Sequence, residues 1–148
     1  MADRTQEHPY KSILCAVDFD ESSLAALRQA ARLAAASEAT LHLLHVAPLI
    51  PGAGEIADSV GPGGDESAAQ RLREIADREL SGVKHEIHTK IAVHSDIAGK
   101  ILSTAHEVKA DLIVTATHGR SGVAHFLLGS VAETVVRRAS CPVLTVRG

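Results

Sequence analysis

Short runs of apolar residues alternate along the chain with longer stretches in which apolar residues recur every third or fourth position. The short runs predict five strands, and their nearly uniform apolarity favours parallel strands that are covered on both faces. The third run instead alternates between apolar and polar residues, which indicates a half-covered strand near an edge of the sheet. The predicted strands are residues 11–17, 40–46, 84–93, 111–116 and 142–146.

The stretches between the strands predict four helices, the last over residues 131–139. Short polar side chains at the start of the other three can accept hydrogen bonds from the first free N–H groups. The expected N-caps are Asp20 for residues 21–36, Asp65 for a helix to about Leu80, and Ser95 or Asp96 for a helix that includes Val108. Residues 48–64 are rich in proline and glycine and predict a loop.

Strand and helix alternate throughout, which predicts an α/β fold: an open, doubly wound, five-stranded parallel sheet of order 3-2-1-4-5 with helices on both faces. With 148 residues, we expect one domain over residues 11–148 after a flexible tail of residues 1–10. Such sheets bind ligands at the carboxyl ends of their strands, where the strand order reverses. Asp18, after the first strand, would therefore face residues 116–119, after the fourth.

The composition excludes several classes of function. A net charge of −3 and only three aromatic residues argue against a nucleic-acid partner. No apolar run reaches about 18 residues, so no membrane span is expected. The first ten residues are polar and do not resemble a signal peptide. Cys15 and Cys141 lie far apart, outside any metal or redox spacing, which favours a reduced, cytoplasmic protein.

The most informative chemistry lies in the loop after the fourth strand. Ala116-Thr117-His118-Gly119 is followed by nine residues and then by Gly129-Ser130, at the start of the last helix. Free N–H groups and the helix dipole favour an anion at such a helix start, and glycine lets a phosphate approach the backbone. The pattern predicts a nucleotide-phosphate site, with turn-forming glycines alone as the alternative.

Other side chains in or near this loop each allow a functional and a purely structural interpretation. His118 could contact a phosphate or assist hydrolysis, or it could only structure the loop. Arg120 and Ser121 could reach phosphate oxygens, although a solvated Arg120 is the simpler interpretation. Asp18 could bind a ligand or could only cap the turn that follows the first strand.

The nine histidines do not predict a metal site. His42 and His45 are three residues apart on one predicted strand, as are His85 and His88 on another, so the members of each pair point to opposite faces. No HExxH motif or Cys/His motif occurs. Ser130 is the one expected Mg²⁺ ligand, and only together with a bound nucleotide.

Several of these segments together resemble the universal stress protein family, over about residues 11–147. The resemblance is carried by Ala16-Val17-Asp18, by His45-Val46, and by the closing run of residues 131–144. The nucleotide-binding branch of the family has the pattern Gly, two residues, Gly, nine residues, then Gly-Ser or Gly-Thr. Gly119, the nine-residue spacer, Gly129 and Ser130 match this pattern.

The resemblance implies an ATP site with Mg or Mn. Asp18 would lie beside the ribose and the adenine, with Ala16 and Val17 just before it. Val46 would lie against one side of the adenine and Thr115 against the other. The phosphates would lie on the loop and the helix start. Together with the loop residues considered above, the predicted nucleotide-binding residues are Ala16, Val17, Asp18, Val46, Thr115, Ala116, Thr117, His118, Gly119, Arg120, Gly129, Ser130 and Val131.

Two positions depart from the family pattern. Ala116 stands where the pattern has its first glycine. If that position needs a positive φ, alanine there is strained by about 1 kcal/mol or more, whereas a position that needs only a small side chain accepts it. Ser95-Asp96-Ile97 stands where the family often has Gly-Asp-Pro, which changes how the chain enters the following helix.

Three functions fit these observations. The leading one is a regulatory stress-response protein that binds ATP with little or no hydrolysis, because no general base is evident and no catalytic residue is assigned. The second is a family member that does not bind ATP and acts as an interaction module. The third is a weak ATPase, or a protein that phosphorylates itself on Ser121 or Ser130.

The last strand also predicts a partner. Val143, Leu144, Thr145 and Val146 form an apolar strand at the expected edge of the sheet, where unpaired backbone groups can pair with another strand. The resemblance likewise implies a homodimer formed through this strand. The alternative is an edge protected by Arg147 and the end of the chain.

Overall fold

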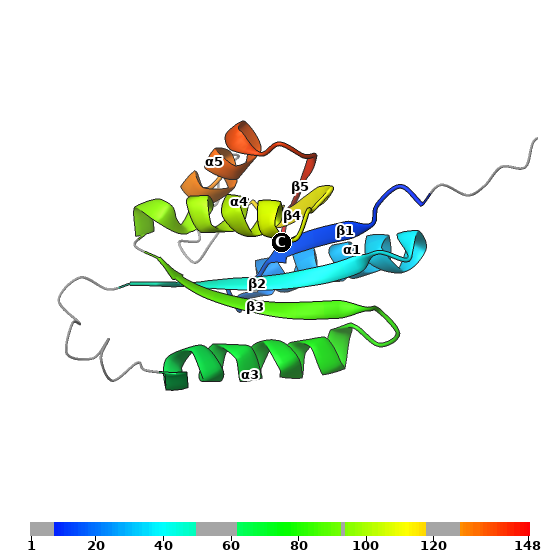
Figure 1. Ribbon diagram of the computed structural model, residues 1–148, viewed down its shortest axis with the longest axis horizontal. Helices are drawn as coiled ribbons and strands as arrows, with labels where there is room; N and C mark the ends of the chain where they lie inside the picture. The colour runs from blue at the N-terminus through cyan, green and yellow to red at the C-terminus, as the bar shows by residue number, and fades with distance from the viewer. Residues whose placement is uncertain (1–7, 50–61, 93, 118–127) are drawn as a thin grey trace, which may run out of the picture.

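A computed structural model describes residues 8–49, 62–92, 94–117 and 128–148. Five parallel strands form one sheet of order β3-β2-β1-β4-β5, as the sequence predicts (Figure 1). The strands are β1 (Ser12–Ala16), β2 (Thr40–Pro48), β3 (His85–Ala92), β4 (Leu112–Ala116) and β5 (Val143–Val146). β3 forms one edge of the sheet, as its alternating sequence indicates, and β5 forms the other.

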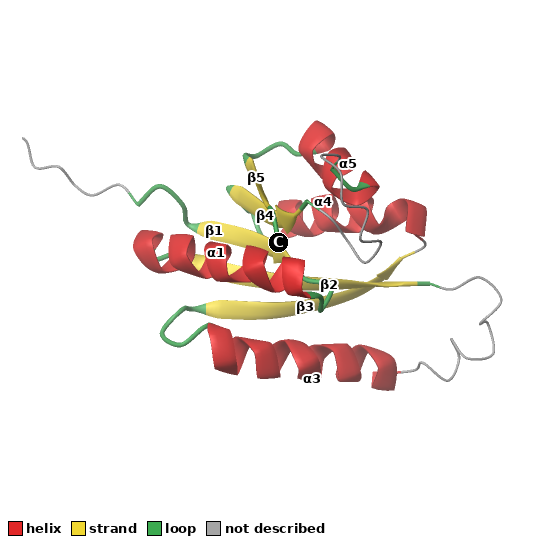
Figure 2. Cartoon of the chain, turned by 180° about the vertical axis from the view of Figure 1, so that it is seen from behind, coloured by secondary structure: helices red, strands yellow, loops and turns green. Residues whose placement is uncertain are grey.

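Helices cover both faces of the sheet. They are α1 (Glu21–Ser37), α3 (Pro62–Glu79), α4 (Ile97–Glu107) and α5 (Ser130–Arg138). α4 and α5 lie on one face, and the view from behind shows α1 in front of the other (Figure 2). The arrangement confirms the doubly wound fold: α1 and α3 cover one face and α4 and α5 the other, because the chain crosses the sheet in opposite directions before and after β3.

Two apolar cores separate these layers. On the α1 and α3 side, Leu27 and Leu72 pack with Ile13, Leu41 and other strand residues. On the α4 and α5 side, Ile101 and Val135 pack with Leu14 and Leu44. Successive residues of β1 and β2 therefore point into different cores, which explains why both strands are apolar almost without interruption.

The helix starts differ in part from the sequence prediction. Asp65 lies inside α3, which begins at Pro62, because proline fits the first turn of a helix, where its missing N–H is not needed. Asp96 is the N-cap of α4, but its side chain makes no capping hydrogen bond; a 3₁₀ turn, His94–Asp96, leads into the helix. Val108 lies just beyond the end of α4, as its C-cap.

Asp20 is the N-cap of α1, as predicted. Its carboxylate accepts a hydrogen bond from the Ser23 N–H at 2.8 Å and another from the Ser22 hydroxyl at 2.8 Å. Both bonds use polar groups at the first turn of the helix, where backbone donors have no partner within the helix. The cap thereby fixes the turn that joins β1 to α1.

Removal of this cap is expected to destabilise the protein. Asp20→Ala should lower the free energy of unfolding by about 1 kcal/mol, since the Ser23 N–H loses its partner. Urea denaturation measures the change. Asp77→Ala, on the exposed side of α3, removes the same charge and is expected to change stability by less than about 0.5 kcal/mol. Equal effects of the two substitutions would show that the cap contributes nothing.

Candidate functional site

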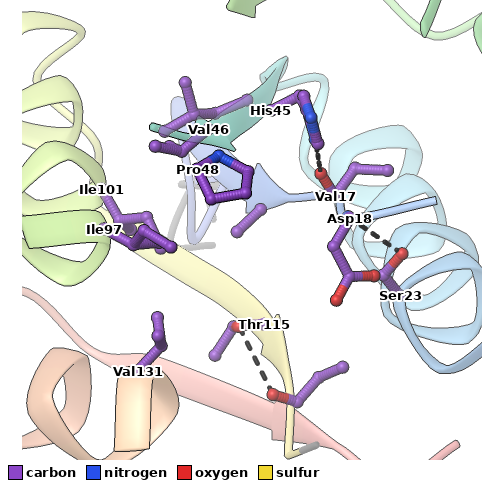
Figure 3. Close-up of a pocket in the computed structure, with 13 residues that line it drawn as sticks. Val17, Asp18, Ser23, His45, Val46, Pro48, Ile97, Ile101, Thr115 and Val131 are labelled. Atoms are coloured by element: carbon purple, nitrogen blue, oxygen red, sulfur yellow. Dashed lines mark hydrogen bonds between the residues drawn. The ribbon is translucent and has the colours of Figure 1, made fainter. Parts of the chain in front are cut away.

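A pocket of about 240 Å³ opens at the carboxyl ends of the central strands. Residues from β1, β2 and β4 form its floor, and residues at the starts of α4 and α5 form one wall (Figure 3). The strand order reverses at this place, because the chain leaves β1 towards one side of the sheet and β4 towards the other. The pocket is lined by Ala16, Val17, Asp18, Ser23, Leu44, His45, Val46, Pro48, Ile97, Ile101, Thr115, Ala116 and Val131.

Asp18 is the acidic residue of this lining. It is half-buried, its backbone N–H donates to the Ser23 hydroxyl at 3.2 Å, and its carboxylate accepts from the Asp20 N–H at 3.3 Å. Burial raises the pKa of the Asp18 carboxyl above its ordinary value, and the neighbouring Asp20 side chain adds to the shift. A titratable group with a perturbed pKa in a pocket is a candidate for ligand contact.

Aromatic contacts hold the turn after Asp18. Phe19 has a φ of 70°, a backbone conformation that bulky residues rarely adopt. The centroid of its ring lies 4.4 Å from the centroid of the His45 ring. The guanidinium carbon of Arg71 lies over the Phe19 ring, 3.9 Å from the ring centroid. His45 Nδ1 is in turn 2.7 Å from the Val17 carbonyl oxygen. Residues from β2 and α3 therefore fix the position of Asp18.

The opposite side of the pocket is apolar. Val46 on β2 faces Ile97 and Ile101, which lie one turn apart at the start of α4, and Val131 lies at the start of α5 (Figure 3). Such walls suit a flat aromatic ring, while a carboxylate at the edge suits a group with hydroxyl donors. A nucleoside combines these two properties.

The structure brings many of the predicted site residues together. The predicted residues that line the pocket are Ala16, Val17, Asp18, Val46, Thr115, Ala116 and Val131. Thr117, Gly129 and Ser130 do not line it, although Ser130 immediately precedes Val131. His118, Gly119, Arg120 and Ser121 lie outside the described residues.

Ala116 does not carry backbone strain. It is the last residue of β4, it pairs with Val146, and it is absent from the described residues with positive φ. Its methyl group lines the pocket instead. The alternative in which this position needs a positive φ is therefore excluded. The position takes a small side chain in an extended backbone conformation.

The two ends of the predicted phosphate loop meet. The Gly129 N–H donates to the Thr117 carbonyl oxygen at 2.7 Å, and the Thr117 N–H donates to the Val146 carbonyl oxygen at 3.0 Å. The Thr117 hydroxyl is buried and has no hydrogen-bond partner among the residues that the structure describes. These bonds place the start of α5 beside the end of β4, so that the helix N-terminus lies next to the pocket.

Sequence reasoning did not find six of the lining residues. They are Ser23, Leu44, His45, Pro48, Ile97 and Ile101. Ile97 and Ile101 carry a usable signal, since residues four apart at the start of a helix share one face. Leu44 and Pro48 carry one too, since they lie two residues on either side of Val46 and share its face of β2. Ser23 and His45 contribute through contacts between elements, which the spacing within one element does not predict.

An open, doubly wound sheet with a pocket at its switch point defines a class of α/β ligand-binding domain. The chain matches the universal stress protein family over residues 9–147, and it belongs to that family. A universal stress protein of Methanocaldococcus jannaschii is 34% identical over 151 residues, which cover 97% of this chain and 86% of the relative.

Solved structures show the same fold. The structure of hypothetical protein MJ0577 is 26% identical, with a TM-score of 0.81 over 94% of this chain and 96% of the other. A universal stress protein in complex with cAMP is 29% identical, with a TM-score of 0.66 over 93% of this chain and 97% of the other. Within the described part of the chain, no helix is long and apolar enough to span a membrane.

The raised pKa of Asp18 generates a pH-dependent prediction. The carboxyl group of Asp18 binds its proton more tightly in the folded state than in the unfolded chain. Ionisation of Asp18 therefore destabilises the fold as the pH rises from the unfolded pKa, about 3.9, through the higher pKa of the folded state. Asp18→Asn keeps an oxygen acceptor for the Asp20 N–H. It is expected to be more stable than the wild type at pH 7, with a gain that shrinks towards zero below pH 4.

Denaturant unfolding of both proteins at pH 7 and at pH 4, without nucleotide, measures this difference. A variant that is less stable than the wild type at pH 7 would contradict the prediction, and so would a gain that does not depend on pH.

Proposed function

We propose that this chain is a cytoplasmic regulatory protein of the stress response that binds ATP at the switch-point pocket, with little or no hydrolysis. The observation that carries the proposal is the pairing of a half-buried carboxylate, Asp18, with the apolar walls at Val46, Ile97 and Val131. The relative that was solved in complex with cAMP, also an adenine nucleotide, supports the same class of ligand.

In the proposed complex, the adenine lies against Val46, with Thr115 on its other side, and the ribose hydroxyls donate to Asp18. The phosphates lie towards the N-terminus of α5, where free N–H groups and the helix dipole favour negative charge. Gly129 and Ser130 are at that helix start. With Thr117, His118, Gly119 and Arg120, they are the proposed phosphate residues, and Ser130 is the proposed contact to Mg or Mn.

The described side chains that face the pocket support the proposal of slow or absent hydrolysis. Phosphoryl transfer needs a group to position the attacking nucleophile, a metal holder and groups that stabilise the developing charge. Among the described lining residues, Asp18 is the one carboxylate, and we assign it to the ribose and not to the phosphates. We therefore assign no catalytic residue and propose that occupancy of the pocket is the regulatory signal.

Calorimetric titration of Mg·ATP into nucleotide-free protein tests the proposal. We expect saturable binding of about one nucleotide per chain. Val131→Trp fills the pocket with an indole and is expected to weaken binding by at least about tenfold, or 1.4 kcal/mol. Val136→Trp is the matched control, because Val136 lies on the same helix, is 44% exposed and does not line the pocket.

Each other outcome identifies a competing function. Absence of binding by ATP, ADP, AMP and cAMP would leave the interaction module. Equal binding by the two tryptophan variants would place the nucleotide elsewhere. Metal-dependent release of ADP much faster than roughly 10⁻⁴ s⁻¹, a rate typical of a nucleotide-binding protein with incomplete catalytic machinery, would indicate an ATPase.

We also propose that two chains pair through β5. This strand pairs with β4 alone among the described residues, and all four of its residues are partly exposed. The carbonyl groups of Pro142 and Val146 accept hydrogen bonds from Ile113 and Thr117, so the even-numbered residues direct their backbone groups towards β4. The N–H of Thr145 then faces outward, where a second strand can bind it.

The proposed dimer predicts a specific effect of proline at this edge. Thr145→Pro removes the outward N–H but none of the hydrogen bonds to β4, and it is expected to make the protein monomeric. Thr145→Val retains the N–H and should remain dimeric. Light scattering at micromolar concentration measures the mass, and circular dichroism confirms that both variants are folded. A monomeric wild type would contradict the proposal.

A further inference from the structure

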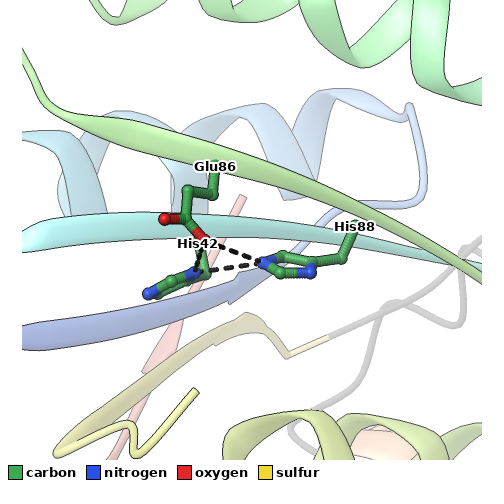
Figure 4. Close-up of side chains that lie close together, drawn as sticks. All are labelled: His42, Glu86 and His88. Carbon is green, nitrogen blue, oxygen red and sulfur yellow. Dashed lines mark hydrogen bonds and ion pairs between the residues drawn. The ribbon is translucent and has the colours of Figure 1, made fainter. Parts of the chain in front are cut away.

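Three side chains with metal-ligating atoms converge on the sheet between β2 and β3: His42, Glu86 and His88 (Figure 4). The register of these parallel strands places His42 opposite Glu86 and Leu44 opposite His88. Glu86 and His88 are two residues apart on β3 and therefore share one face of the strand. His42 faces them because it shares its side of the sheet with its partner on β1, Leu14, in the core beneath α4.

The spacing of the histidines in the sequence predicts no group of metal-ligating side chains, and this cluster corrects that prediction. His42 and His45 do point to opposite faces of β2, but His42 meets a histidine of the neighbouring strand instead. His42 Nδ1 lies 3.0 Å from His88 Nε2. Spacing within one strand could not reveal the cluster, because its members come together through the register between strands.

The distances between the three atoms match a metal site. Glu86 Oε2 lies 3.4 Å from His42 Nδ1 and 3.9 Å from His88 Nε2. Zinc binds imidazole nitrogen and carboxylate oxygen at about 2.0–2.2 Å, which puts two ligands of a tetrahedral ion roughly 3.3–3.5 Å apart. The observed triangle of 3.0, 3.4 and 3.9 Å lies around these values. An ion could bind all three atoms with shifts of only a few tenths of an ångström.

The protonation state of His42 also suits a metal. Its side chain is 8% exposed, and burial lowers the pKa of the imidazole, although the Glu86 carboxylate opposes this shift. A neutral imidazole offers a free electron pair, which is the form that binds metals. The Glu86 side chain is 57% exposed, so an ion has access from solvent.

The next carboxylate along this face is already engaged. Glu107 of α4 receives hydrogen bonds from Lys90 Nζ at 3.0 and 2.9 Å, one to each of its oxygens. It is therefore not available as a fourth ligand while this ion pair persists. Three protein ligands with solvent at one side leave the fourth position of a tetrahedral ion to water.

We propose that His42, Glu86 and His88 bind one divalent transition-metal ion, with Zn²⁺ as the favoured member of the class. Two imidazoles and a carboxylate suit Zn²⁺, whereas Mg²⁺ and Ca²⁺ prefer oxygen ligands. The ion would cross-link the edge strand β3 to β2. The proposal does not rest on the nucleotide site, since none of the three side chains lines that pocket.

Zinc binding to the untagged full chain, without nucleotide, tests the proposal. Calorimetry should show one Zn²⁺ per chain with a Kd of roughly 1 μM or tighter. Co²⁺ should bind in its place with the visible absorption bands of a four-coordinate ion, which Zn²⁺ then abolishes. Zinc should also raise the melting temperature, since it binds the folded chain.

Matched variants locate the ion. Glu86→Gln and His88→Ala each remove one ligand from a partly exposed position and should weaken Zn²⁺ binding by at least about tenfold. His85→Ala is the control: His85 lies on the same strand, faces the other side and bonds to the Val83 carbonyl. It should bind Zn²⁺ like the wild type. His42 is left intact, because its buried side chain also supports the fold.

Several results would overturn the proposal. No Zn²⁺ binding at 100-fold excess over 1 μM would show that the two imidazoles form only a hydrogen-bonded pair. Unchanged binding in Glu86→Gln and His88→Ala would place the ion on other histidines. Normal zinc binding together with absent ATP binding would refute the proposed function but not this site, so the two proposals fail separately.

Discussion

The position of β1 at the centre of the sheet constrains every other feature of this protein. β1 hydrogen-bonds to β2 on one side and to β4 on the other, and its residues Ile13, Leu14 and Cys15 have no exposed surface. Because parallel strands connect through right-handed crossovers, a chain that continues on opposite sides of a central strand must leave a gap above its carboxyl end. The pocket is thus a consequence of topology, and the side chains at its rim determine what it accepts.

The two proposed sites lie on the same face of β2, beneath α4, at different positions along the strand. Along β2, Leu44 and Val46 face the pocket near the carboxyl end, whereas His42 faces the histidine and glutamate of β3 nearer the amino end. Leu44 separates the two regions, since it lines the pocket and stands opposite His88 in the register. Position along the strand, and not the alternation of faces, therefore keeps the proposed ion apart from the proposed nucleotide.

The sequence predicts well those features that depend on the residues of a single helix or strand. The apolar runs locate all five strands, and Asp20 marks the start of α1, because these signals depend on neighbours in the chain. Asp18 and Ala116 could be predicted because each lies at the carboxyl end of a strand that the apolar runs locate. The fold class then makes these two strands neighbours in the sheet. The start of α3 is mispredicted because Pro62-Gly63-Gly64 is typical of a loop, although proline is also compatible with a first helical turn. The placement of His45 and the His42 cluster depends on contacts between elements, which local patterns do not contain.

Phe19 links the pocket to a helix that does not line it. Its ring contacts both the imidazole of His45, which lines the pocket, and the guanidinium of Arg71, on α3. Its backbone has a conformation that aromatic residues seldom adopt. A displacement of the turn at Asp18 would change these contacts. A ligand that displaced this turn would therefore couple its own binding to the docking of α3 on the sheet. An amide on α3 could report, through its rate of hydrogen exchange, whether a ligand rests against Asp18.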